Sequence, residues 1–175
     1  MTYKANANQM VAQDLSQTNA AAQLVLGTTF SGFDPGLGFG EFVYVQGTGT
    51  INVGDWVEFT QTLSGGVVTL KVQQWAGGAN SGKPLGVAMA TLTGNLFGWV
   101  QLFGNAIASS SGTVAAGDPA FFNAAGQTKT AAVAGKQVLN AQATTANNAT
   151  INGAAIGAGK SVYFLNYPVA QGQIT

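Results

Sequence analysis

Four carboxylates between residues 34 and 58 are the groups best placed to do chemistry. No lysine lies among these acidic residues, which are Asp34, Glu41, Asp55 and Glu58. Calcium is bound by several converging oxygens, many of them from carboxylates. The spacing matches no calcium-binding loop, so we expect ordinary charges in solvated turns and keep calcium as the alternative. Nothing singles out a pair of carboxylates in a groove, which argues against glycoside hydrolysis.

The stretch 154–161, AAIGAGKS, comes close to the P-loop pattern that cradles phosphates. That pattern needs glycines at both ends of a four-residue gap, then Lys and Ser or Thr at the start of a helix. Alanine occupies position 154, where the first glycine is required, and a strand-like sequence follows Ser161. We therefore predict a Gly-Lys turn here and no nucleotide site.

Most other reactive residue types are missing. The chain has no histidine and no cysteine, and its six basic residues are all lysines, so it has no arginine. Histidine usually transfers protons at neutral pH, and cysteine acts as a nucleophile or as a ligand of soft metals. Arginine binds phosphate through its planar guanidinium group. We predict a protein that is not an enzyme and holds no metal and no cofactor. An enzyme that uses only Asp, Glu, Ser, Thr and Tyr stays as an alternative.

The remaining charges are sparse. Only 7% of the residues are charged and the formal net charge is zero, so the surface must be largely polar and neutral, which favours contact with other protein. Five dispersed lysines follow the acidic stretch, and they are too few to bind nucleic acid. The acidic side of one subunit could face the lysine side of the next in a ring. Solvated, unpaired charges are the simpler interpretation.

The three tryptophans allow two interpretations. Trp56, Trp75 and Trp99 could form a platform for a sugar ring. Tryptophans at strand positions are more often part of the core, and we predict that role here.

The first 35 residues differ from the rest of the chain in composition. Residues 5–22 are mainly Ala, Asn and Gln, and their sizeable apolar groups are Met10, Val11 and Leu15. We predict an arm, with a short helix as the alternative because Ala and Gln tolerate helix. Residues 30–40 follow as a glycine-punctuated loop that carries phenylalanines. The candidate contacts with another subunit or a partner are Met10, Val11, Leu15, Phe30 and Phe33.

Polar residues follow Lys4, so we expect no signal peptide, and no stretch reaches the roughly 20 apolar residues of a membrane span. We expect a protein that is made in a cytoplasm and does not contact membrane.

Beyond Gly40 the pattern is that of β-strands. Val68, Leu70 and Val72 alternate with polar residues, a period of two that a helix cannot satisfy. The segment 56–59 precedes this strand across 63–66, LSGG, which predicts an antiparallel hairpin. Further strands are predicted at 41–45, 85–92, 97–103, 121–122, 137–143 and 161–167.

These short strands with Gly-rich turns predict an all-β fold. We expect a single antiparallel β-barrel or β-sandwich over residues 36–175, preceded by an arm and Gly/Phe loop over residues 1–35. The residues predicted to be buried in its core are Trp56, Leu70, Val72, Trp99 and Phe164.

A small or β-branched residue, a glycine and a charged residue recur before four predicted strands. The glycines are Gly54, Gly117, Gly135 and Gly159. We interpret each as a turn that needs a left-handed or restricted backbone and leads into a strand. The spacing is too irregular for a solenoid.

An ordered set of such segments resembles a known family. EFVYVQG at 41–47 is followed by VGDWV at 53–57, GVAMA at 86–90, GWVQ at 98–101 and AAGDP at 115–119, and YFLNYPV at 163–169 resembles the closing strand. Over roughly residues 36–167 the succession resembles the capsid decoration, or cement, proteins of tailed bacteriophages, which are phage structural proteins. This chain is more neutral and richer in alanine than that family suggests.

The resemblance implies a β-rich virion protein on the outer surface of an icosahedral capsid. Such a protein bridges major capsid subunits and cements them against internal DNA pressure, commonly as a homo-oligomer, for which we favour a trimer over a dimer. Cementing depends on buried area and multivalency, not on reactive residues. The alternative from another class is a carbohydrate-binding or adhesive module of a phage tail or cell surface.

Overall fold

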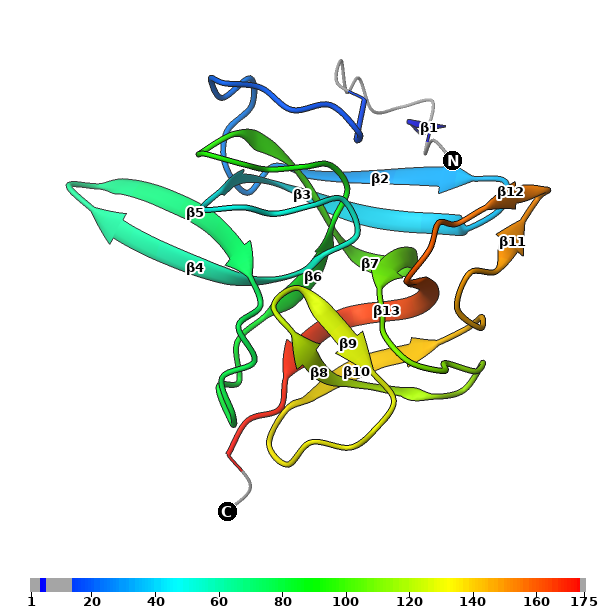
Figure 1. The fold of residues 1–175 in the computed structure, drawn as a ribbon. Helices are drawn as coiled ribbons and strands as arrows, with labels where there is room; N and C mark the ends of the chain where they lie inside the picture. The colour runs from blue at the N-terminus through cyan, green and yellow to red at the C-terminus, as the bar shows by residue number, and fades with distance from the viewer. Residues whose placement is uncertain (1–3, 6–13, 174–175) are drawn as a thin grey trace.

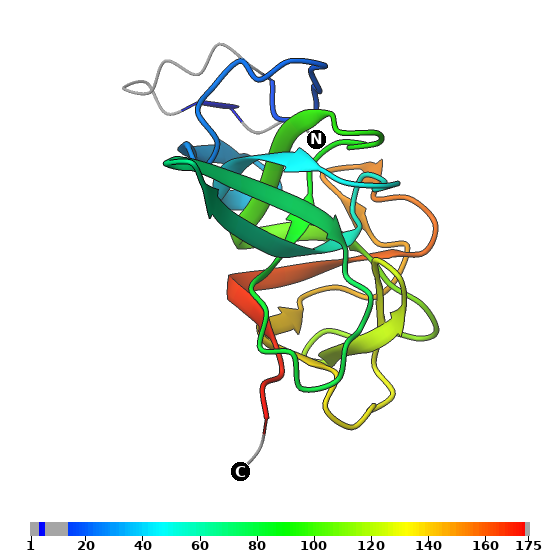
Figure 2. The same cartoon turned by 90° about the vertical axis from the view of Figure 1, so that its left-hand side faces the viewer.

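The chain is all-β. The computed structural model describes residues 4–5 and 14–173, and within them there is no helix. Figures 1 and 2 show strands and long connections stacked in two halves. The strands are β1 (Lys4–Ala5), β2 (Thr29–Asp34), β3 (Gly38–Gly47), β4 (Trp56–Ser64), β5 (Val67–Gln74), β6 (Leu85–Ala88), β7 (Phe97–Ser109), β8 (Pro119–Ala124), β9 (Gln127–Lys129), β10 (Gln137–Ala143), β11 (Thr150–Ile151), β12 (Ala154–Ala155) and β13 (Lys160–Ala170).

Five strands close into a ring, here called the first ring. The pairing order runs β3, β5, β4, β6 and β7, and β7 pairs again with β3. All of these pairings are antiparallel except the short contact of β3 with β5, where Gln46 lies opposite Lys71 and Gly47 opposite Val72. Among the pairings of the named strands, the predicted antiparallel architecture is therefore correct except at this contact, which makes the sheet mixed; the isolated bridge between Ser110 and Thr128 is also parallel.

The sheet continues from β7 into the other half. β13 pairs with β7, and β10, β8 and β9 follow in that order. A bridge between Ser110 and Thr128 brings β9 back beside the end of β7. The 13-residue strand β7 thus belongs to both halves of the molecule and joins them.

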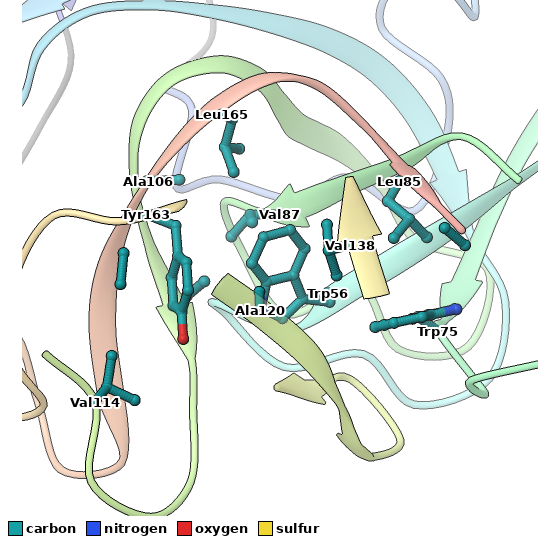
Figure 3. Close-up of a cluster of buried hydrophobic side chains, with 13 residues drawn as sticks. Trp56, Trp75, Leu85, Val87, Ala106, Val114, Ala120, Val138, Tyr163 and Leu165 are labelled. Atoms are coloured by element: carbon teal, nitrogen blue, oxygen red, sulfur yellow. The ribbon is translucent and has the colours of Figure 1, made fainter. Parts of the chain in front are cut away.

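Each half has its own core. Inside the first ring, Val45, Val57, Val72 and Val100 belong to one buried cluster. The other half is filled by a cluster around Trp56, Trp75 and Tyr163, drawn in Figure 3. A third cluster, around Trp99, packs the N-terminal segment onto the sheet. Because Trp56 comes from β4, the first ring contributes directly to the core of the second half.

The predicted strands are confirmed, except that the strand predicted at 85–92 ends at Ala88. The β4–β5 hairpin is antiparallel and turns at Gly65 and Gly66, both with positive φ. Each predicted turn glycine has a left-handed backbone and precedes a strand: φ is 88° at Gly54, 92° at Gly117, 69° at Gly135 and 67° at Gly159. Only glycine adopts such values without a steric cost from Cβ.

The predicted loop over residues 30–40 is wrong. β2 and β3 pair as an antiparallel hairpin, with Phe33 opposite Phe39. The turn between β2 and β3 contains the boundary predicted between the N-terminal arm and loop (residues 1–35) and the β domain (residues 36–175). Asp34 accepts hydrogen bonds from the backbone N–H groups of Gly36 and Leu37 at 2.7 and 3.0 Å, which is the local signal for a turn.

The predicted core is partly correct. Trp56, Val72 and Trp99 are buried, whereas Leu70 is half-buried. The prediction for Phe164 is wrong, because its side chain is 42% exposed. Neighbours on a strand point to opposite faces, and β13 directs Tyr163 and Leu165 inward, so Phe164 must face outward.

Candidate functional site

The acidic residues are used within the chain. Asp55 is 6% exposed and accepts hydrogen bonds from the Asn52 backbone at 2.8 Å and from Gln74 Nε2 at 2.6 Å. Ser109 Oγ donates a third at 3.3 Å. These partners come from the end of β5, the end of β7 and the turn before β4. Asp55 therefore ties elements together where the two halves meet.

Glu58 is buried beside a lysine. Lys83 Nζ lies 2.8 Å from Glu58 Oε1, and Gln73 Nε2 donates to the same oxygen at 2.6 Å. A buried carboxylate requires such partners, because desolvation of an unpaired charge is costly. Glu58 and Lys83 therefore pair within one chain. They do not serve the contact considered above, in which the acidic side of one subunit faces the lysine side of the next.

No metal site emerges in the part of the chain that the structure describes. It contains no group of three or more acidic, histidine or cysteine side chains that could hold an ion. Within residues 154–161, the short strand β12 is followed by β13 and no helix begins, so the interpretation as a Gly-Lys turn is confirmed. Lys160 Nζ instead donates to the Val53 carbonyl at 3.0 Å.

The tryptophans do not form a sugar platform. Trp56, Trp75 and Trp99 are each 0% exposed. Trp99 packs against Tyr44 and Phe30, with ring centroids 5.3 and 5.9 Å apart. The prediction that they belong to the core is confirmed.

A surface of aromatic rings is the main candidate for a functional site. We call it the aromatic face and define it by Phe33, Phe39, Phe103, Phe164 and Tyr167. Phe103 on β7 is its centre. Its ring centroid lies 6.3 Å from that of Phe39, 5.6 Å from that of Phe164 and 6.1 Å from that of Tyr167. Phe33 is directly opposite Phe39 in the β2–β3 pairing and so shares its side of the sheet.

The aromatic face is open to solvent. The exposed fractions are 57% for Phe33, 42% for both Phe39 and Phe164, and 51% for Tyr167, while Phe103 is half-buried. Large apolar patches of this kind mark sites of contact on soluble proteins. The rings come from β2, β3, β7 and β13, so the paired sheet holds them in place.

Tyr167 has an unusual backbone. Its φ is 49°, in the left-handed region that a bulky residue rarely adopts. It lies where the pairing of β10 with β13 shifts register, between Leu139 opposite Val169 and Ala141 opposite Leu165. The Tyr167 hydroxyl donates a hydrogen bond to Glu41 on β3, and this bond raises the pKa of the phenol above its ordinary value. This hydrogen bond to Glu41 fixes the position of the Tyr167 ring on the aromatic face.

An apolar groove of about 410 Å³ begins at Tyr167. One wall is the β4–β5 hairpin, through Phe59, Gln61 and Leu70. Tyr167, Pro168 and Val169 of β13 also line the groove, as do Val43, Pro84, Leu85 and Leu102. The described residues that line it include no charged side chain. Tyr167 therefore belongs both to the groove lining and to the aromatic face.

Comparison with protein-family models, curated proteins and solved structures finds no match. The site must therefore be interpreted from its own chemistry. Across residues 4–5 and 14–173, no helix has the length and apolar character to cross a membrane.

The predicted contact residues have different positions. Met10 and Val11 lie outside the described residues. Leu15 and Phe30 are each 3% exposed and pack in the cluster around Trp99, so their side chains are covered by this chain's own core and do not face a partner. Phe33 is exposed on the aromatic face, and its contact with a partner stays a prediction.

Sequence reasoning missed the other members of the face, which are Phe39, Phe103, Phe164 and Tyr167. The alternation along 163–167 shows that Phe164 and Tyr163 point in opposite directions. Both are aromatic, so the sequence does not say which of them is covered.

Proposed function

We propose that this protein is a non-enzymatic structural protein of a tailed-phage virion. It decorates the outer surface of the capsid and cements it by bridging major capsid subunits, as a homo-oligomer. The proposal starts from the ordered resemblance of residues 36–167 to capsid decoration proteins.

The aromatic face is the observation that carries the proposal. Interface centres are enriched in aromatic residues and depleted of charge. On this face three rings pack around that of Phe103, Phe33 lies opposite Phe39, and Glu41 accepts the hydrogen bond of Tyr167. A rigid sheet that displays such rings suits lasting contact with protein. The carboxylates described above serve internal hydrogen bonds, and none is paired with a second acid in a groove.

Co-sedimentation with shells tests the proposal. Shells assembled from the major capsid protein of the same phage should pellet the protein at saturable stoichiometry. The double variant Phe33→Ser, Phe164→Ser should bind at least about tenfold more weakly, because hot-spot aromatics cost 2 kcal/mol or more when truncated. Val25→Ser is the matched control, since Val25 is 81% exposed but belongs to neither the aromatic face nor the groove.

Three results would contradict this function. The first is no binding to shells at any concentration. The second is equal binding by the double variant and the control. The third is saturable glycan binding that the double variant loses while shell binding is unchanged, which would favour the carbohydrate-binding alternative.

A further inference from the structure

The β4–β5 hairpin has two chemically different faces. Residues directly opposite in an antiparallel pair share a face, and three such pairs are Phe59 with Val72, Gln61 with Leu70 and Leu63 with Val68. The other face carries Glu58, Thr60, Thr62, Thr69, Lys71 and Gln73. Between Glu58 and Leu63 on β4, and between Val68 and Gln73 on β5, one face of the hairpin is therefore mainly apolar and the other is polar.

The apolar face runs from the core of the first ring into solvent. Val72 is 1% exposed, Phe59 and Leu70 are half-buried, and at the tip Leu63 is 72% and Val68 is 48% exposed. Figure 1 shows the hairpin reaching beyond the rest of the chain on the left. A two-stranded hairpin alone is marginally stable in water, so an uncovered apolar tip is unfavourable unless a partner buries it.

The groove lies at the root of the same hairpin. Phe59, Gln61 and Leu70 belong both to the apolar face of the hairpin and to the groove wall. Its described lining carries no charge, so a charged occupant would be buried there without a partner, and an uncharged apolar occupant is favoured.

The tip of the hairpin has that chemistry. Residues 60–70, TQTLSGGVVTL, contain no charged side chain. One chain thus supplies both an uncharged apolar projection and an uncharged apolar groove that can receive it.

We propose that the occupant of this groove is the β4–β5 hairpin tip of a second copy of the chain. Leu63 and Val68 of one copy lie in the groove of its neighbour, against Tyr167, Pro168 and Val169. This inference rests on the homo-oligomer of the proposed function and names the surface that forms it.

In this arrangement the hairpin tip and the groove form the contact between copies. Of the aromatic face, only Tyr167 also lines the groove, so Phe33, Phe39 and Phe164 remain for the capsid contact of the proposed function.

The first test measures mass in solution. The wild type should be oligomeric by native mass spectrometry and sedimentation equilibrium. The double variant Leu63→Asp, Val68→Lys, which keeps the net charge at zero, should raise the dissociation constant by at least about tenfold. The matched control is Thr62→Asp, Thr69→Lys, at the neighbouring pair on the polar face. It should leave the mass unchanged, and circular dichroism should show both variants folded.

The second test locates the contact. The chain has no cysteine, so a mixture of Leu63→Cys and Tyr167→Cys proteins can form a disulfide only between copies. Oxidation should give the mixed dimer in clear excess over a mixture of Thr62→Cys and Tyr167→Cys proteins. Equal yields from the two mixtures would overturn the inference.

Other outcomes separate this inference from the proposed function. A wild type that is monomeric at all concentrations, or an oligomer that the Leu63, Val68 variant leaves intact, overturns the inference. If that variant keeps its oligomeric mass but no longer pellets with shells, the groove receives the capsid and the proposed function stands. An oligomer that dissociates as predicted, in a protein that never binds shells, supports the inference and contradicts the capsid role.

Discussion

Trp56 and Tyr163 meet edge to face, with ring centroids 5.4 Å apart and an interplanar angle of 79°. Trp56 begins β4, Tyr163 lies in β13, and both are 0% exposed. The contact joins a strand of the first ring to a strand of the second half. Folding of the two halves should therefore be coupled through this pair.

Replacement of Trp56 by alanine should destabilise the whole protein. Loss of a buried tryptophan costs about 3–5 kcal/mol, because the ring leaves a cavity that the strands cannot fill. Urea unfolding measures the change. Phe164→Ala is the control, since that ring is 42% exposed and should cost much less. Similar costs for the two variants would show that the core assignment is wrong.

Gly104 should not tolerate a side chain. A Cβ at this position would overlap the carbonyl oxygen of Phe39 on the paired strand β3, where Gly40 lies opposite Gly104, and φ is 89°. Gly112 has a similar φ of 73° but open space around it. We expect Gly112→Ala to cost about 1–2 kcal/mol from backbone strain alone. Gly104→Ala should lower the free energy of unfolding clearly more in the same experiment. Equal losses for the two variants would contradict the close approach of β3 to Gly104.

Stability should fall in alkaline solution, in part through Tyr163. Burial raises the pKa of its phenol, partly offset by a hydrogen bond from Thr128 and reinforced by Asp118. Above the ordinary tyrosine pKa of about 10, the unfolded chain releases a proton that the folded protein retains, so the free energy of unfolding decreases. The contribution is fully present below pH 10 and is lost as the pH rises towards the folded-state pKa.

Tyr163→Phe isolates this effect. Its free energy of unfolding should fall less steeply above pH 10 than that of the wild type, by at most about 1.4 kcal/mol per pH unit. Lysine titration is common to both proteins and cancels in the comparison. Parallel pH profiles would show that Tyr163 does not contribute.

Calcium and chelators should leave the melting temperature unchanged within about 5 °C. A ligand that binds only the folded state raises stability, and the carboxylates near residues 34–58 already accept hydrogen bonds from this chain. Differential scanning calorimetry with calcium and with EDTA checks this. A larger shift, or a stoichiometric metal in the purified protein, would contradict the prediction.

Two N-terminal truncations should behave differently. A chain that starts at Asp14 retains Leu15, which is 3% exposed, and should remain folded. A chain that starts at Thr29 also lacks Leu24 and Leu26, which pack on the cluster around Trp99. It should lose at least about 2–5 kcal/mol, the cost of removing one buried leucine. Equal unfolding midpoints would show that residues 14–28 do not support the fold.

The chain that starts at Asp14 also tests the arm. If residues 2–13 serve assembly, the chain that starts at Asp14 should bind shells or its own copies more weakly than the full chain. Unchanged binding would remove that role.

The sequence by itself determined the all-β class and most of the strands. The apolar period of two along residues 68–72 is compatible with a strand and not with a helix. Glycines such as Gly54 indicate left-handed turns that precede strands. These are local signals, because they depend on side chains and backbone angles within a few residues.

Only the tertiary structure decided which face of each strand is covered. Phe30 and Phe33 look alike in the sequence, yet Phe30 is 3% and Phe33 is 57% exposed. The parallel contact of β3 with β5 and the meeting of Phe103 with Tyr167 depend on chain closure over long separations. Alternation assigns residues to two faces, but burial depends on what packs against each face, and residues far away in the chain provide that cover.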